Sequence, residues 1–205
     1  MILEAMLPAL IAFFVAAASP GPATLALAAT AMSRGLRPGM AFATGLAVGL
    51  ALWGIVAAAG LGALMQTSAW ALVVVRMIGG AYLLYLAWQA ARAALSAADE
   101  TRHLLGGNLF RRGAMLNATN PKAVFAWLAV LSIGLPDGGT PGTLWLMTAA
   151  CALLGLAIYL SYAMAFSRPA MMAGYASGRR WIEALAALVF GLVGFRLITV
   201  RGETP

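Results

Sequence analysis

Six long, mostly apolar runs of residues set the first limit on how this chain can fold. A helix of about 20 apolar residues crosses the roughly 30 Å hydrocarbon core of a bilayer. None of the runs alternates polar and apolar residues as a strand of a membrane barrel does. The runs extend over about 5–31, 39–64, 70–91, 113–134, 143–167 and 181–200. The sequence therefore predicts an all-α integral membrane protein with six transmembrane helices, forming a single membrane domain over 1–205.

Charge supports this prediction and indicates an orientation. Only 9% of the residues are charged, against about 25% in soluble domains. Nine of the 13 basic residues fall in the connections after the first, third and fifth runs: Arg34, Arg37, Arg92, Arg102, Arg111, Arg112, Arg168, Arg179 and Arg180. The positive-inside rule then predicts cytoplasmic basic loops and termini on the opposite side. Since no basic stretch is interleaved with aromatic residues, we expect no nucleic-acid partner.

The longest polar connection, over 96–112, divides the six runs into two sets of three. We expect repeat one at about 1–95 and repeat two at about 110–205. Because each set has an odd number of crossings, two halves of the same fold must be inverted relative to each other, as in many secondary transporters. Pro20 and Pro121 occupy matching places in the first run of each half. The sequence predicts two inverted three-helix repeats whose first and fourth transmembrane helices are broken at proline motifs.

The two proline motifs are "SPGP" at 19–22 and "TNPK" at 119–122. Proline has no N–H and its ring opens the preceding helical turn. In hydrocarbon an unpaired carbonyl costs several kcal/mol, so both breaks are expected to face the protein interior. A helix that restarts after each break presents free N–H groups and a positive dipole end, which suit a carboxylate. The alternative for each proline is an ordinary packing kink.

Lys122 lies about nine residues into the fourth run, hence roughly 14 Å deep at 1.5 Å per residue. A lysine at this depth costs about 2.5–3.5 kcal/mol on insertion scales, so it should face a cavity or a partner. We expect it to meet a substrate carboxylate; the alternative is that it only pairs with freed carbonyls or lies in a wet vestibule. The predicted substrate-binding residues are Ser19, Pro20, Gly21, Pro22, Thr24, Asn117, Asn120, Pro121 and Lys122.

Several other residues are expected to have structural roles and not to bind substrate. Arg76 and Arg196 lie near the ends of their runs, where their side chains can reach the headgroups. Gly45 and Gly49 are expected at a close helix contact. Four tyrosines are expected to pack or to anchor the protein at the interface: Tyr82, Tyr85, Tyr159 and Tyr162.

Acidic residues are expected only at the ends of the runs or in the connections. Glu183 falls at the start of the last run, near residue 181. A carboxylate within the membrane, for proton coupling, is therefore not expected.

Enzymatic chemistry is not expected. The single histidine, His103, has no companion at metal-ligand or acid–base spacing, so no metal or cofactor is predicted. The single cysteine, Cys151, is expected to be a small packing residue. A channel remains an alternative, although two matched breaks around one site favour alternating access.

Four segments carry a resemblance to a known family. They are "SPGPATLALAATAMSRGLRPGMAFATGLAVG", "RMIGGAYLLYLAWQAAR", "FRRGAMLNATNPKAVFAWLAVLS" and "GLVGFRLI". Together they resemble the LysE/RhtB superfamily of amino-acid exporters over nearly the whole chain. Many members have Asp or Asn directly after Pro-Gly-Pro, where this chain has Ala23. This difference removes a partner for a substrate ammonium or a coupling proton.

The resemblance implies a multi-pass secondary transporter of the bacterial inner membrane. It would export small amino acids or related metabolites, with periplasmic termini and cytoplasmic basic loops. A homodimer is one option for its assembly. The alternative is a channel-like protein, or a translocator of the same fold for another solute or ion. Substrate, coupling ion and oligomeric state are not readable from the sequence.

Overall fold

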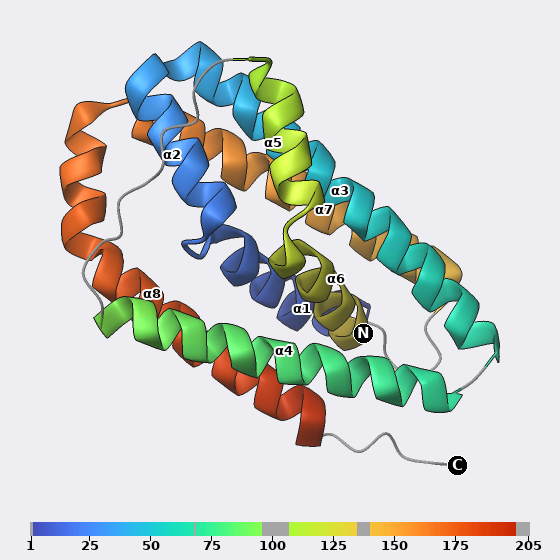
Figure 1. The fold of residues 1–205 in the computed structure, drawn as a ribbon. Helices are drawn as coiled ribbons and strands as arrows, with labels where there is room; N and C mark the ends of the chain where they lie inside the picture. The colour runs from blue at the N-terminus through green and yellow to red at the C-terminus, as the bar shows by residue number, and fades with distance from the viewer. Residues whose placement is uncertain (1, 68, 96–106, 135–139, 200–205) are drawn as a thin grey trace.

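The chain is helical throughout the part that the structure, a computed structural model, describes, namely residues 2–67, 69–95, 107–134 and 140–199 (Figure 1). The helices are α1 (Ile2–Ala18), α2 (Pro22–Arg34), α3 (Leu36–Thr67), α4 (Ala69–Leu95), α5 (Leu109–Ala118), α6 (Pro121–Gly134), α7 (Pro141–Phe166) and α8 (Pro169–Thr199). The predicted all-α class is confirmed. Predictions for the following residues, or for their side chains, lie outside the described part: Arg76, Arg102, His103 and Arg179.

Within the described residues, two helices are long and apolar enough to cross a membrane. These are α3, over Leu36–Gly60, and α7, over Pro141–Phe166. The bent pair of α1 and α2 passes the same test as one broken span. Large apolar side chains such as Leu52, Val56 and Leu153 are more than half exposed, as lipid-facing positions are. These features agree with an integral membrane protein.

Both predicted interruptions at the proline motifs are confirmed. Helix α1 ends at Ala18, and α2 restarts at Pro22 with a bend of 54°. Helix α5 ends at Ala118, and α6 restarts at Pro121. The restarts place proline at the first helical position, where its missing N–H leaves no intrahelical bond unmade.

The helices form two flanks around the broken pairs. Helices α4 and α8 pack along each other on one flank, and α3 packs on α5 and α7 on the other (Figure 1). Helices α1 and α6 pack together between these flanks. The proline breaks therefore lie inside the helix assembly.

Glycine permits a close approach between α3 and α5. A Cβ atom at Gly45 or at Gly113 would overlap the backbone carbonyl of Phe110 or of Phe42, respectively. At Gly49 it would overlap the carbonyl of Ala114. The predicted role of Gly45 and Gly49 as close-contact positions is confirmed.

Candidate functional site

The two proline breaks meet in space although about half of the chain separates them. Lys122 Nζ donates hydrogen bonds to the backbone oxygen of Ser19 at 3.1 Å and to Ser19 Oγ at 2.5 Å. Lys122 belongs to the first turn of α6, and Ser19 follows directly on the end of α1. The expectation that both breaks face one shared interior space is therefore met.

The carbonyls that the prolines free are satisfied by donors in their surroundings. The carbonyl of Ala18 accepts a 2.6 Å bond from the Tyr162 hydroxyl of α7, and that of Ala16 accepts one from Ser19 Oγ at 3.1 Å. In the second break, the carbonyl of Asn117 accepts from the Asn120 N–H at 3.2 Å. These bonds remove the cost of unpaired carbonyls in a low-dielectric interior.

Two polar side chains stabilise the restarts of the helices. The N–H of Gly21 donates to Thr24 Oγ1 at 2.9 Å, and Thr24 Oγ1 lies 3.1 Å from the Gly21 carbonyl. The N–H of Lys122 donates to Asn120 Oδ1 at 3.0 Å. Asn120 therefore caps α6, whereas Thr24 stabilises the first turn of α2.

Asn117 lies at the centre of a buried network and is 1% exposed. Its Nδ2 donates to the carbonyl of Leu46 in α3 at 2.9 Å and to the Tyr159 hydroxyl of α7 at 3.1 Å. Its Oδ1 accepts from Asn120 Nδ2 at 3.3 Å. Asn117 thus connects the second break to two other helices.

All nine sequence-predicted site residues line one or both of two adjoining cavities. The smaller cavity, of about 20 Å³, has room for roughly one water molecule and is lined by Thr24, Asn117, Tyr159 and Ala23 among others. The larger cavity, of about 830 Å³, lies within the size range of small-molecule sites. Both cavities are lined by Ser19, Gly21, Asn120 and Lys122; Pro20, Pro22 and Pro121 line the larger one.

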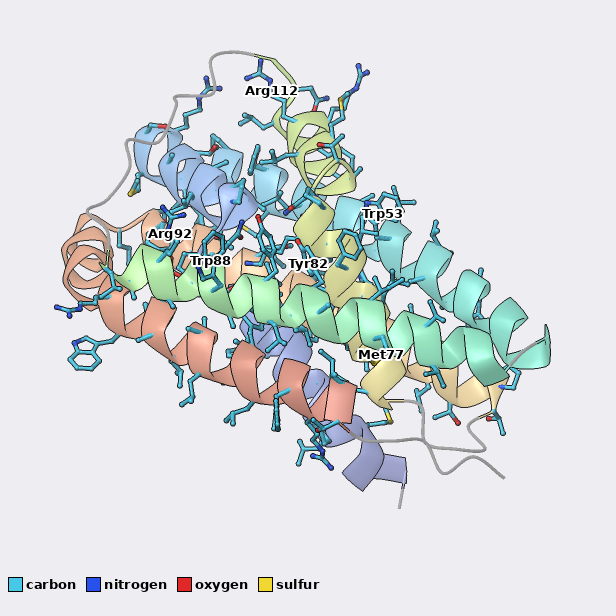
Figure 2. All side chains as sticks on the ribbon, turned by 60° about the horizontal axis from the view of Figure 1, so that its bottom comes forward. Trp53, Met77, Tyr82, Trp88, Arg92 and Arg112 are labelled. Atoms are coloured by element: carbon cyan, nitrogen blue, oxygen red, sulfur yellow. The ribbon has the colours of Figure 1, made fainter. Side chains whose placement is uncertain are left out.

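A row of side chains along α4 forms one wall of the larger cavity. Figure 2 shows Tyr82, Trp88 and Arg92 following one another along this helix. Tyr82 stacks on Phe125 with ring centroids 4.3 Å apart, and the Arg92 guanidinium lies 5.0 Å from the Trp88 ring centre. This wall offers π faces as well as hydroxyl groups to a ligand.

The four tyrosines lie at the larger cavity or at the two breaks. Tyr82 and Tyr85 line the larger cavity, and Gln89 Nε2 donates to the Tyr85 hydroxyl at 2.6 Å. Tyr159 and Tyr162 bond to Asn117 and to the Ala18 carbonyl at the two breaks. The predicted packing role is confirmed for Tyr159 and Tyr162, which pack in the main buried cluster. Their bonds to the two breaks were not predicted, because these bonds depend on which helices become neighbours.

Glu183, which the sequence places at the start of the last apolar run, is buried in the helix assembly. This residue lies in the middle of α8, is 3% exposed, and lines the larger cavity together with Lys122. Helix α8 begins before that apolar run, at Pro169. The proline was the sequence signal for this earlier start, since proline favours the first turn of a helix.

No metal centre can be assembled from the described residues, because no three His, Cys, Asp or Glu side chains gather among them. The site instead combines one partly buried ammonium, two restarted helices, a buried carboxylate and an aromatic wall. Such a set can hold a small ligand that carries a carboxylate.

Comparisons with known proteins point in the same direction. A family model described as LysE type translocator matches residues 14–201. The chain is 32% identical to a threonine efflux protein of Salmonella typhi over 193 residues, covering 91% of this chain and 94% of the relative. It is 30% identical, with the same coverage, to the threonine efflux protein of Escherichia coli K12. A leucine efflux protein of Salmonella choleraesuis is 35% identical over 114 residues, about half of each chain. No solved structure matches the chain.

Proposed function

The chain belongs to the LysE type translocator family, and from this premise we propose that it exports a small amino acid or a closely related metabolite from the bacterial cytoplasm. The predicted resemblance to the LysE/RhtB superfamily is thereby confirmed. Relatives named as threonine and leucine efflux proteins support an amino-acid substrate. The membrane would be the bacterial inner membrane, with the basic loops in the cytoplasm and both termini in the periplasm.

A single observation carries this proposal, namely Lys122 at the meeting point of the two breaks. Its ammonium bonds to Ser19 and lines a cavity of about 830 Å³. The restarts of α2 at Pro22 and of α6 at Pro121 line the same cavity. Helix starts and an ammonium at one place favour a carboxylate, which every free amino acid carries. We therefore assign the substrate carboxylate to Lys122 and the two helix starts.

The helix packing supports two inverted repeats of three crossings each. If α1 to α4 are matched in order with α5 to α8, the contact of α3 with α5 corresponds to that of α7 with α1. The contact of α3 with α6 likewise corresponds to that of α7 with α2, and all four contacts are present. The pairs α4–α8 and α3–α7 correspond to themselves. We propose that the two halves rock around the site between them.

The larger cavity extends toward the side that we assign to the cytoplasm. Its lining follows α4 from Tyr82 to Arg92, toward the end of the helix that leads into a basic connection. At the other side of the breaks, α4 packs on α6 and α8 packs on α1. We propose that this is the cytoplasm-facing state. Export would then follow when the α4–α8 pair moves from α1 and α6 toward α2 and α5.

Counterflow in proteoliposomes tests the proposed function. The purified protein is reconstituted, the vesicles are loaded with unlabelled threonine or leucine, and the uptake of the labelled amino acid is followed. We expect saturable uptake that unlabelled amino acid inside the vesicles accelerates. Flux that rises linearly with concentration and shows no acceleration would indicate a channel. Absence of flux for every amino acid tried would overturn the proposal.

A further inference from the structure

The ammonium to which we assign the substrate carboxylate is already bonded to the chain itself. Lys122 Nζ donates to the Ser19 carbonyl at 3.1 Å and to Ser19 Oγ at 2.5 Å. The Ser19 hydroxyl donates in turn to the Ala16 carbonyl at 3.1 Å, so a lone pair of Oγ is left to accept from the ammonium. Two oxygen atoms of one buried residue therefore take the place that the two oxygen atoms of a carboxylate can take.

The space around Lys122 limits where a substrate can meet it. The smaller cavity beside it has a volume of about 20 Å³, which is enough for roughly one water molecule. On the side of Gly21, an added Cβ atom would lie 3.3 Å from Nζ. Of the two cavities, only the larger one, of about 830 Å³, can hold an amino acid, and both Ser19 and Lys122 line it. A carboxylate that enters this cavity meets an ammonium whose bonds are directed to Ser19.

We propose that Ser19 competes with the substrate for Lys122: it holds the ammonium while the site is empty, and the substrate carboxylate displaces it. This inference rests on the proposed function, because that function assigns the carboxylate to Lys122. A carboxylate carries a full negative charge and the Ser19 oxygens do not, so the exchange of partners favours binding. In the empty site, Ser19 spares the protein an ammonium without acceptors. Ser19 is then a positioning residue that acts through Lys122.

Displacement leaves the Ser19 carbonyl in need of another donor, and Thr24 can supply one. Thr24 Oγ1 lies 3.4 Å from the Ser19 oxygen and 3.1 Å from the Gly21 carbonyl, so its one proton has two acceptors within reach. Because a buried carbonyl without a donor costs free energy, the Thr24 hydroxyl should turn to Ser19 once the ammonium has left. Ser19 directly follows α1 and Thr24 belongs to the first turn of α2. Substrate binding therefore tightens the first break.

The test begins with Ser19→Ala. The Kd of labelled leucine or threonine, whichever the wild-type protein exchanges, is measured on the purified protein, and the maximal counterflow rate is measured in proteoliposomes. Loss of the hydroxyl weakens the competitor, so the amino acid should bind about three- to tenfold more tightly than to the wild-type protein. The maximal rate should fall, because Ser19 helps the ammonium to release the carboxylate. A residue that binds the substrate directly would show the opposite sign, with weaker binding after its removal.

Thr24→Val tests the replacement donor, since it keeps the shape of the side chain and removes the hydroxyl. The bound state loses the bond to Ser19, so the Kd should rise by about three- to tenfold, opposite in sign to Ser19→Ala. Thr24→Ser keeps the hydroxyl and should recover most of this affinity. General damage to the first break would instead weaken binding in both Ser19→Ala and Thr24→Val.

Ser33→Ala is the matched control. It removes the hydroxyl of an exposed serine of α2, which donates to the Ala29 carbonyl of the same helix at 2.7 Å, and it should bind and exchange as the wild type does.

Two results would overturn the inference and leave the proposed function standing. The first is binding by Ser19→Ala that is unchanged or weaker, in a wild-type protein that exchanges the amino acid. The second is binding by Thr24→Val that is as tight as in the wild type or tighter. If the wild-type protein neither binds nor exchanges any amino acid tried, the proposed function fails and this inference fails with it.

Discussion

The two proline breaks occupy matching places in the two halves, yet they are held in different ways. The first break depends on the other half of the chain, since Tyr162 donates to the Ala18 carbonyl and Lys122 donates to Ser19. The second break also receives a donor from the other half, since Trp53 Nε1 donates to the Ala118 carbonyl, and Asn120 caps it by bonding to the N–H of Lys122 and to Asn117. The contact that distinguishes the first break is therefore the Lys122 ammonium on Ser19.

This difference indicates that the two proline breaks have different roles in transport. Because the Lys122 side chain reaches from α6 to Ser19, substrate binding at Lys122 acts on the first break directly. The second break carries Lys122 on a helix start that Asn120 caps, and it can serve as the fixed side of the site. Matched substitutions at the two breaks can test this view.

The largest effect is expected for Lys122→Met. The variant keeps an unbranched side chain but removes both bonds to Ser19 and the cation assigned to the substrate. Charge-assisted bonds of this kind contribute about 1.5–3 kcal/mol each, so counterflow should fall by about 100-fold or more. Arg196→Gln, at an exposed site of α8, should retain normal counterflow. Normal rates in Lys122→Met, with equal amounts in the membrane, would remove Lys122 from the site.

A matched pair of substitutions compares the donors to the two helix ends. Tyr162→Phe removes the donor to the Ala18 carbonyl, and Trp53→Phe removes the 2.7 Å bond from Trp53 Nε1 to the Ala118 carbonyl. Each leaves one carbonyl without that donor, which costs about 1–3 kcal/mol. Both variants should lower the melting temperature in detergent, but only Tyr162→Phe should also reduce counterflow by about tenfold. Equal losses of counterflow would show that the two breaks contribute alike.

The smallest effects are expected for substitutions at the restarts themselves. A Cβ at Gly21 would lie 3.3 Å from Lys122 Nζ, the end of a flexible side chain, and the backbone there is extended, so Gly21→Ala should fold normally. It should lower counterflow by a few-fold through displacement of the ammonium. Asn120→Ala removes a cap and should destabilise the protein by about 0.5–2 kcal/mol with less effect on counterflow. Thermal unfolding and counterflow, measured on both variants, separate these outcomes; the reverse pattern would contradict the proposed difference between the breaks.

The breaks and their proximity could be predicted from the sequence because proline acts locally. It lacks an N–H wherever it occurs, so a helix must stop and restart at Pro20–Pro22 and at Pro121. Since lipid offers no partner to freed carbonyls, both breaks had to face inward, where Lys122 needed a partner as well. The observed contact of Lys122 with Ser19 agrees with this expectation.

The donors to the freed carbonyls could not be predicted in the same way. Tyr162 and Trp53 are ordinary aromatic residues of α7 and α3, and nothing in their local sequence shows which helix they will contact. Only the packing of α7 against α1, and of α3 against α5, brings them to the helix ends. Glu183 is a similar case, because its depth depends on where α8 begins and on the cavity beside α4.

The sequence by itself determined a lipid-embedded helical chain with two interrupted helices and a lysine near the point of interruption. These properties come from apolar composition and from the missing N–H of proline, which act whatever surrounds them. The tertiary structure alone decided that Glu183 faces the same cavity as Lys122, and which side chains bond to the two breaks. Such pairings depend on the distances between helices that are remote in sequence, and no local pattern contains those distances.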